Sequence, residues 1–162
     1  MNEITVTLLY LVKEDQILLA MKKRGFGADR FNGVGGKIET GETIEQALIR
    51  ETKEEINVTP TKFSQVAEIT FDEYFKGVPT IMHVHVFLAT EWVGEPTESE
   101  EMCPEWFAKD NLPYDNMWPS DQYWLHLVLK GDIIIAKLKS DEFDKMLSHD
   151  VQIVKSLANT IS

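Results

Sequence analysis

The sequence predicts an α/β (α+β) fold, an α/β/α sandwich in which a mixed β-sheet carries helices on its faces. Runs rich in β-branched and aromatic residues stand before, between and after two helical segments, and that order is typical of mixed layers. The chain of 162 residues has an apolar fraction of 43%. Because this length and apolar fraction suit one hydrophobic core, we expect a single domain over residues 1–162.

The first predicted elements are two short strands. Ile4–Val12 and Gln16–Met21 are rich in β-forming residues, and Lys13–Asp15 lies between them as a turn. Together these segments predict a β-hairpin. The following segment, Lys22–Gly36, contains five glycines and several basic residues, so we expect a loop with one short strand at Arg30–Val34.

A helix is predicted over Thr43–Ile56. Thr43 is a small polar residue suited to capping the helix N-terminus, and Glu45 places a negative charge in the first turn. Asn57 ends the segment, and asparagine tolerates the left-handed conformation found after many helices. The helix is therefore expected to have defined ends.

Further strands are predicted in the middle of the chain. Ser64–Phe75 and Thr80–Trp92 have strand composition and are joined around Gly77. Glu91–Pro104 reads as an acidic loop, and Glu105–Ala108 as a short strand.

A second helix is predicted after the central strands. It covers Ser120–Lys130, between Pro119 and Gly131. Ile133–Lys139 and Val151–Val154 are then predicted as the last strands of the sheet.

Charge and cysteine content restrict the partners and the compartment. The 27 acidic and 16 basic residues give a formal net charge of -11, which argues against sequence-independent binding to nucleic acid. Cys103 is the single cysteine, so an internal disulfide is excluded. The chain shows no signal-peptide pattern and no apolar run long enough to cross a bilayer. We therefore expect a cytoplasmic protein with no nucleic-acid or membrane partner.

The first helix carries an unusual stripe of carboxylates. Each helical residue advances by roughly 100°, which places Glu51 and Glu55 within about 20° of Ile44 on the apolar face, with Glu54 beside them. Like charges at these spacings destabilise a helix, and a divalent cation with oxygen ligands would offset the repulsion. A solvated acidic face that pairs with neighbouring basic residues is the alternative.

The spacing around this helix carries a family resemblance. The segment reads Gly36, five residues, Glu42, seven residues, Arg50-Glu51-Thr52-Lys53-Glu54-Glu55-Ile56-Asn57-Val58. It resembles the Nudix box, G-x5-E-x7-R-E-U-x-E-E-x-G-U, where U is a bulky apolar residue. All charged positions match. Thr52 and Asn57 depart from the pattern at an apolar position and at the final glycine.

The resemblance to Nudix hydrolases implies a metal-dependent reaction. It assigns the metal to the following residues: Gly36 through its carbonyl, Glu51, Glu54, Glu55 and Glu101. Mg²⁺ is the expected cofactor and Mn²⁺ the alternative. The same four glutamates and Arg50 would form the catalytic set, with Arg50 orienting the glutamates and Glu42 in a structural role. The reaction implied is attack of water on phosphorus, with Glu51 as our first choice of general base and Glu55 or Glu101 as alternatives.

Residues outside the box resemble the MutT-homologue branch that hydrolyses oxidised purine nucleoside triphosphates. The similar segments are Met21–Ala28, Asn32–Lys37, Met82–Phe87, Glu98–Met102 and Met117–Pro119, and the resemblance extends from Thr5 to Lys130. It implies a substrate pocket made of Asn32, Trp118, Asp121, Ser120, Thr7, Lys22, Phe26, Phe71 and Met82.

The chemistry of these residue types suits a purine. Trp118 offers a flat face for stacking, and Asn32 can donate and accept hydrogen bonds along a base edge. Asp121 could also do both if burial kept its carboxyl protonated. Ser120 is a departure, because the branch has two adjacent aspartates after Trp-Pro and serine cannot ionise. The loss places the branch's acceptance of oxidised adenine in doubt and makes oxidised guanine the first choice.

The expected function is hydrolysis of 8-oxo-dGTP, or related oxidised purine nucleotides, to the monophosphate and pyrophosphate. Such a diphosphatase would sanitise the nucleotide pool and so support DNA repair, as a monomer or homodimer acting on a nucleotide substrate. One alternative is a Nudix hydrolase acting on another nucleoside diphosphate derivative. A second alternative is a non-catalytic nucleotide-binding domain, which would not need Arg50, Glu51, Glu54 and Glu55 together.

Overall fold

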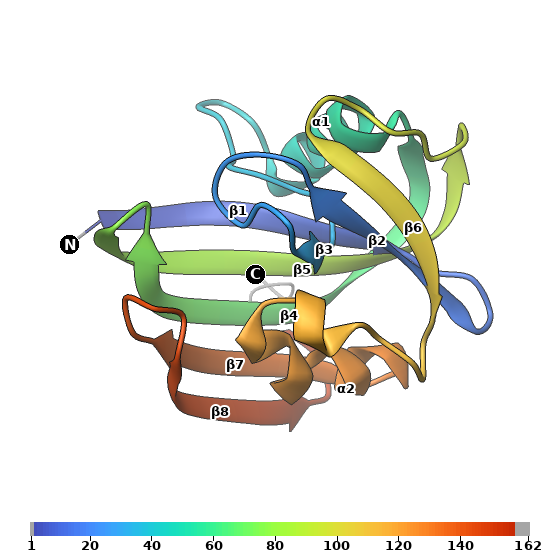
Figure 1. The fold of residues 1–162 in the computed structure, drawn as a ribbon. Helices are drawn as coiled ribbons and strands as arrows, with labels where there is room; N and C mark the ends of the chain where they lie inside the picture. Colours follow the sequence, from blue (N-terminus) through green and yellow to red (C-terminus); the bar gives the residue numbers. More distant parts are fainter. Residues whose placement is uncertain (1, 158–162) are drawn as a thin grey trace.

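The computed structural model describes residues 2–157 and has a five-stranded mixed sheet at its centre (Figure 1). The strand order is β1-β5-β4-β7-β8. β1 pairs parallel with β5 and β4 pairs parallel with β7, whereas the β4–β5 and β7–β8 pairs are antiparallel. The bounds are Asn2–Leu11 for β1, Thr59–Phe75 for β4, Val78–Val93 for β5, Ile133–Ser140 for β7 and Met146–Val154 for β8.

A smaller antiparallel sheet and four short helical segments complete the fold. The sheet has the order β3-β2-β6, with bounds Phe31–Asn32, Gln16–Lys22 and Met102–Ala108 for β3, β2 and β6. The helices are α1 (Ile44–Ile56), η1 (Tyr114–Asn116), η2 (Pro119–Tyr123) and α2 (Leu125–Leu129). The predicted fold class is confirmed, whereas the second, three-stranded sheet was not predicted. Within residues 2–157, no helix combines the length and the apolar character that a membrane span requires.

Two hydrophobic cores lie on opposite faces of the large sheet. Leu48 and Ile56 of α1 pack in one core with Leu9 of β1. Tyr10, the next residue of β1, belongs to the other core together with Trp124 beside α2. Successive side chains of a strand point to opposite faces, so α1 covers one face of the sheet while η2 and α2 cover the other (Figure 1).

The predicted N-terminal hairpin is wrong. Val12 and Ile17 form one isolated bridge, and the chain then separates into two sheets, with β1 beside β5 and β2 beside β6. The four successive residues Ile17–Ala20 are all buried, so both faces of β2 are covered. A strand covered on both faces belongs between layers, and this burial is the reason that it leaves its neighbour in sequence.

The predicted second helix is broken into η2 and α2 at Trp124. The φ and ψ of Trp124 are -138° and -32°, outside the helical range, and its side chain is 1% exposed. The indole packs edge-on against the Tyr10 ring at 6.3 Å. Because burial of this large side chain requires a non-helical backbone at Trp124, the helix predicted over Ser120–Lys130 is wrong as one continuous element.

The α1 ends agree with the sequence prediction. Thr43 Oγ1 accepts a hydrogen bond from Gln46 N at 3.1 Å, and Gln46 Oε1 accepts one from Thr43 N at 2.9 Å. This capping box satisfies two N–H groups that the helix itself cannot bond. Asn57 adopts the left-handed conformation with φ of 63° and ends the helix. The position of α1, and therefore of its carboxylates, is fixed at both ends.

Candidate active site

The glycine segment before α1 packs directly against the carboxylate stripe. Gly35 N donates a hydrogen bond to Glu55 Oε1 at 2.8 Å. A Cβ on Gly36 would lie 2.6 Å from the carboxyl carbon of Glu51, and a Cβ on Gly35 would collide with the backbone carbonyl of Thr7. Only glycine allows both close approaches, which bring the backbone of this segment to the glutamates.

Arg50 is the centre of a charged hydrogen-bond network. Its Nε and Nη2 donate to the two carboxylate oxygens of Glu42 at 2.6 and 2.9 Å. Nη1 donates to Glu51 at 2.8 Å and to Glu54 at 3.3 Å, and Nη2 donates to the Lys37 carbonyl at 3.2 Å. The Arg50 guanidinium lowers the pKa of Glu42 to about 2. This geometry agrees with the predicted structural role of Glu42 and with an orienting role of Arg50 toward two glutamates.

The glutamates differ in burial and in charge environment. Glu55 is buried, and burial, opposed by the Gly35 hydrogen bond and assisted by the neighbouring Glu51, raises its pKa to about 8. Burial also raises the pKa of Glu51. The Glu54 side chain is 58% exposed. Glu101 lies near enough for its charge to raise the pKa of both Glu51 and Glu55, and Lys23 N holds its carbonyl at 2.8 Å.

The side chains that would hold a divalent cation are close together but are turned toward protein partners. Among residues 2–157, no three His, Cys, Asp or Glu side chains are gathered in ligand geometry. Arg50 engages Glu51 and Glu54, and the Gly35 amide engages Glu55. The site nevertheless fits a hard cation, because it offers carboxylate oxygens whose charged forms are disfavoured by burial and mutual repulsion.

A cavity of about 200 Å³ opens beside this carboxylate site. Its lining includes Gly36 and Glu55 at one side and extends to η2 at the other. All nine residues that the sequence resemblance assigned to the substrate pocket line this cavity, namely Thr7, Lys22, Phe26, Asn32, Phe71, Met82, Trp118, Ser120 and Asp121. The structure thus brings together residues from separate strands, loops and a 3-10 helix into one cavity.

Aromatic rings form one wall of the cavity. The Phe26 ring lies 5.0 Å from the Trp118 ring and 4.7 Å from the Phe75 ring. The Arg30 guanidinium lies over Trp118 at 4.3 Å. A Cβ at Gly27, whose φ is +82°, would lie 3.0 Å from the Trp118 ring. The glycine-rich loop is therefore packed closely onto the tryptophan that was predicted to stack on the base.

Asn32 presents donors to the cavity and not an acceptor. Its Oδ1 accepts hydrogen bonds from Gly33 N at 2.9 Å and from the Tyr10 hydroxyl at 3.1 Å. Since a backbone N–H can only donate, the atom beside Gly33 must be the amide oxygen. The Nδ2 group is left for a ligand. Asn32 can therefore offer a hydrogen-bond donor to a ligand in the cavity.

Asp121 and Thr7 carry polar atoms without hydrogen-bond partners among the described residues. Asp121 is 4% exposed and Thr7 1% exposed, and both Asp121 Oδ2 and Thr7 Oγ1 are unpartnered. Burial raises the pKa of Asp121 to about 7, against smaller lowering effects of Trp124, Trp118 and Arg30. The cavity therefore contains a carboxyl with a raised pKa and buried polar atoms that a ligand can satisfy.

Glu73 is a cavity residue that sequence analysis missed. It is 8% exposed, lines the cavity and lies two residues from Phe71 on β4. Strand alternation could have identified it, because residues at spacing two share one face of a strand and Phe71 was already assigned to the pocket. Phe75, two residues further along, also lines the cavity and was missed in the same way.

Comparison with known proteins gives consistent matches. The NUDIX domain model matches residues 1–128. The chain is 43% identical to the oxidized purine nucleoside triphosphate hydrolase of Mus musculus over 93% of this chain and 95% of that protein. The protein of the same name from Danio rerio is 41% identical, covering 94% and 96% of the two chains. The mutator MutT protein from Bacillus halodurans has a similar structure, with a TM-score of 0.81, 27% identity, and coverage of 92% and 97%.

Proposed function

Because the chain belongs to the NUDIX domain family, we propose that it hydrolyses oxidised purine nucleoside triphosphates to the monophosphate and pyrophosphate, with 8-oxo-dGTP as the first choice. The observation that carries the proposal is the shared cavity. Its lining joins the buried, unpartnered Asp121 carboxyl at one side to Gly36 and Glu55 at the other. A purine held at the first side would place its phosphates beside the carboxylates. Hydrolysis of oxidised nucleotides would sanitise the nucleotide pool.

The carboxylate side of the cavity is proposed to hold Mg²⁺. The proposed ligands are the Gly36 carbonyl, Glu51, Glu54, Glu55 and Glu101. A bound divalent cation supplies charge neutralisation for the phosphates and lowers the pKa of the attacking water. Arg50 keeps Glu51 and Glu54 near their working positions through its contacts of 2.8 and 3.3 Å. Glu51 remains our first choice for the proton acceptor, with Glu55 and Glu101 as alternatives.

The other side of the cavity is proposed to bind the base. Trp118 and Phe26 contribute aromatic surface, with Phe71 and Met82 completing an apolar lining. Asn32 Nδ2 donates to an acceptor on the base, since its oxygen is already bonded. Asp121, with a pKa of about 7, can donate and accept along the same edge. Ser120 adds a buried hydroxyl, and Lys22 lies near the phosphate side.

We further propose that residues 1–162 form one domain that acts in the cytoplasm, as a monomer or homodimer. β7 and β8 lie beyond the residues matched by the family model, yet they complete the same five-stranded sheet. The net charge of -11 supports the absence of a nucleic-acid partner. Nucleoside triphosphates are intracellular metabolites, which supports the cytoplasmic location.

A substrate panel tests the proposal. Initial rates would be measured with Mg²⁺ on 8-oxo-dGTP, dGTP, a nucleotide sugar and a dinucleoside polyphosphate, with products separated by chromatography. We expect the highest kcat/KM on 8-oxo-dGTP, with pyrophosphate as the second product. Equal kcat/KM values on 8-oxo-dGTP and dGTP would refute the specificity. A higher value on a nucleotide sugar or dinucleoside polyphosphate would indicate another Nudix activity, and binding without turnover would indicate a non-catalytic domain.

A further inference from the structure

Glu73 places a carboxyl on the apolar face of β4. Phe71, Glu73 and Phe75 alternate along the strand, and all three line the cavity. The intervening residue, Asp72, points to the opposite face, where its carboxylate lies 4.0 Å from Lys139 Nζ. The Glu73 carboxyl is therefore directed into the cavity between two phenylalanines and not into solvent.

Glu73 is a largely buried residue with an exposed fraction of 8%. None of the residues 2–157 donates a hydrogen bond to its carboxyl. Burial, with a further contribution from the negative charge of Asp144, raises the pKa of Glu73 to about 7. A carboxyl that lines a cavity and receives no protein donor is available to form hydrogen bonds with a ligand.

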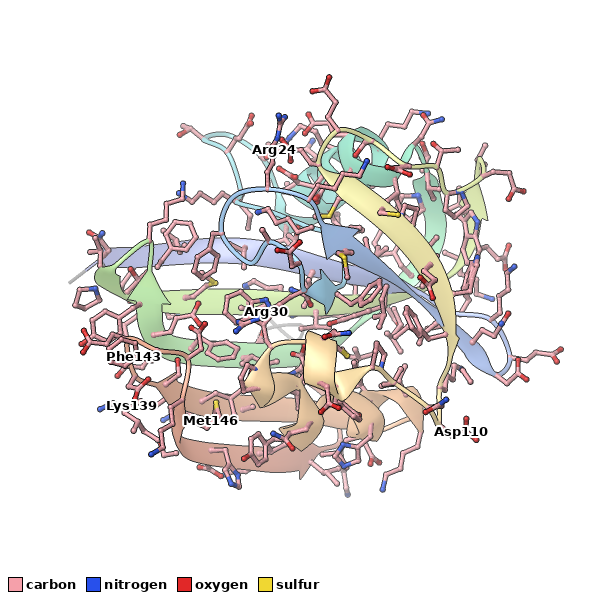
Figure 2. The ribbon with its side chains drawn as sticks, in the orientation of Figure 1. Arg24, Arg30, Asp110, Lys139, Phe143 and Met146 are labelled. Atoms are coloured by element: carbon pink, nitrogen blue, oxygen red, sulfur yellow. The ribbon has the colours of Figure 1, made fainter. Side chains whose placement is uncertain are left out.

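The ion pair between Arg30 and Asp144 lies between Glu73 and the predicted base-binding region in the electrostatic environment of the cavity. Asp144 lies in the turn between β7 and β8, at the end of the sheet where β4 also ends (Figures 1 and 2; Phe143 marks this turn). Its carboxylate contacts Arg30 at 3.1 Å, and Arg30 lies over Trp118 and lowers the pKa of Asp121. Glu73 and Asp121 thus belong to one electrostatic environment around the cavity.

We infer that Glu73 is a specificity-determining residue of the base pocket, which forms hydrogen bonds with the N7–H and O8 edge of an 8-oxopurine. The inference rests on the proposed function and identifies the group that reads the oxidation. It also supplies the pocket with a second carboxyl in addition to Asp121, from β4 and not from position 120, where this chain has serine.

The chemistry of the purine edge explains the selectivity. Oxidation at C8 replaces C8–H by a carbonyl and converts N7 from an acceptor into an N–H donor. An ionised Glu73 carboxylate accepts from this N–H, and a protonated carboxyl accepts from N7–H while donating to O8. An unoxidised purine offers only the N7 lone pair and C8–H, so it repels the carboxylate or satisfies a single hydrogen bond. A pocket that depends on a substrate N–H discriminates strongly against an analogue that lacks it.

The test is the ratio of kcat/KM for 8-oxo-dGTP to that for dGTP in three full-length variants. Glu73→Leu removes both hydrogen-bonding functions within an apolar neighbourhood. Glu73→Gln keeps one acceptor and one donor on a side chain of the same shape. Asp72→Leu is the control, because a carboxylate side chain is likewise replaced by leucine one residue away on the opposite face. Both substrates are measured on the same sample, so the ratio is independent of the folded fraction.

We expect Glu73→Leu to lower the ratio by about tenfold or more, through a higher KM for 8-oxo-dGTP at nearly unchanged kcat. Glu73→Gln should keep the ratio within about threefold of wild type, and Asp72→Leu should not change it. A wild-type ratio in Glu73→Leu, or an equal loss in Asp72→Leu, overturns the role of Glu73. A wild-type enzyme with a ratio near one overturns the proposed substrate instead, so the two failures are distinguishable.

Discussion

The carboxylate side of the site, formed by the α1 glutamates and Gly35, and the base side of the cavity differ in the hydrogen-bond pairing of their polar groups. On the carboxylate side, Glu51 and Glu54 are bonded to Arg50, and Glu55 is bonded to the Gly35 amide. On the base side, Asp121 Oδ2 and Thr7 Oγ1 have no partner among the described residues. Both sides contain carboxyls with raised pKa values, and on both sides burial outweighs the neighbouring groups that support the charged form.

This difference in pairing indicates that the two sides bind their ligands in different ways. The carboxylate side holds its negative charges in place with an arginine and a backbone amide, so a cation can take over groups that are already positioned. The base side keeps buried groups without partners, so a base that supplies the correct donors and acceptors gains the full benefit of pairing them. Reaction and recognition can therefore be perturbed separately.

The largest effect is expected on the carboxylate side. Glu55→Gln removes the charge of a buried proposed ligand while keeping a group that Gly35 N can still contact. We expect kcat to fall by about 10³-fold, because the cation and the transfer of the proton both depend on this cluster. KM for 8-oxo-dGTP should change little. Pyrophosphate release at saturating Mg²⁺ measures the change.

The control for this prediction is Glu45→Gln. Glu45 is an exposed residue in the first turn of the same helix, away from the cavity lining. It should keep kcat within about twofold, since surface substitutions usually have small effects. Full turnover by Glu55→Gln would show that the carboxylate side does not carry the reaction.

The next largest effect is expected on the pH dependence of the free energy of unfolding, through the buried Asp121 carboxyl. Its pKa is about 7 in the folded protein against 3.8 as the ordinary value, so the folded state binds more protons than the unfolded state between about pH 4 and 7. The free energy of unfolding should therefore fall as the pH rises through this window. Asp121→Asn should reduce the fall by roughly 2–4 kcal/mol between pH 5 and pH 8.

Denaturant unfolding at the two pH values measures this difference. Asp115→Asn is the control, because Asp115 is an exposed aspartate in η1 and should leave the pH dependence of wild type unchanged. Glu55 and Glu73 contribute to the same pH range, so the comparison uses the difference between the variant and wild type. An identical pH dependence in Asp121→Asn would mean that this carboxyl is not the strained group on the base side.

A smaller effect of the same substitution is expected on substrate binding. Asp121→Asn keeps the shape and the hydrogen-bonding capacity of the side chain but fixes which atom donates and which accepts. We expect KM for 8-oxo-dGTP to rise by about tenfold with kcat nearly unchanged. Steady-state kinetics at fixed Mg²⁺ tests the separation of the two sides. A loss confined to kcat would contradict it.

The carboxylate side could be predicted from sequence because it is local. Gly36, Glu42, Arg50 and the glutamates belong to one loop and one helix, so spacing along the chain determines which side chains meet. Thr52 is fully buried at a position where the family pattern has an apolar residue. Its hydroxyl is satisfied by the Leu48 carbonyl at 2.8 Å within the helix, which makes the burial tolerable.

The base side could be predicted only through resemblance, because its residues come from separate elements. Spacing gave no reason to bring Asn32 of β3 and Asp121 of η2 into one cavity with Phe71 of β4. Their assignment came from matching segments of a known family. That route could not reveal Glu73, since a resemblance carries over only matching residues. Strand alternation places Glu73 on the same face of β4 as Phe71, and both residues line the cavity.

The wrong N-terminal hairpin has a related cause. Proximity in sequence favours pairing of neighbouring strands, and Val12 and Ile17 do form one bridge. The continuous burial of Ile17–Ala20 is satisfied only between layers, so β2 pairs with β6 from a distant part of the chain. The pairing of β2 therefore depends on contacts between distant parts of the chain, which a local sequence pattern cannot predict.

The smallest expected effect tests whether the hairpin formed by β7 and β8 supports the base side. Asp144→Asn removes the ion pair with Arg30 at 3.1 Å, whose two side chains are 29% and 35% exposed. Asparagine tolerates the positive φ of 63° at this position, so the turn itself should be kept. We expect a change in stability below about 1 kcal/mol, because partly exposed ion pairs contribute little.

The consequence for substrate binding should be larger than that for stability, because Arg30 lies over Trp118 at 4.3 Å (Arg30 is labelled in Figure 2). Without Asp144 to hold it, the guanidinium restrains the tryptophan less. KM for 8-oxo-dGTP should then rise by about two- to fivefold at unchanged kcat, an effect of the size expected for an exposed cation–π contact. Asp150→Asn, an exposed substitution on β8, should leave KM unchanged. An unchanged KM in Asp144→Asn would limit the base side to the cavity lining and leave the hairpin a purely structural role, whereas a fall in kcat would connect it to the carboxylate side.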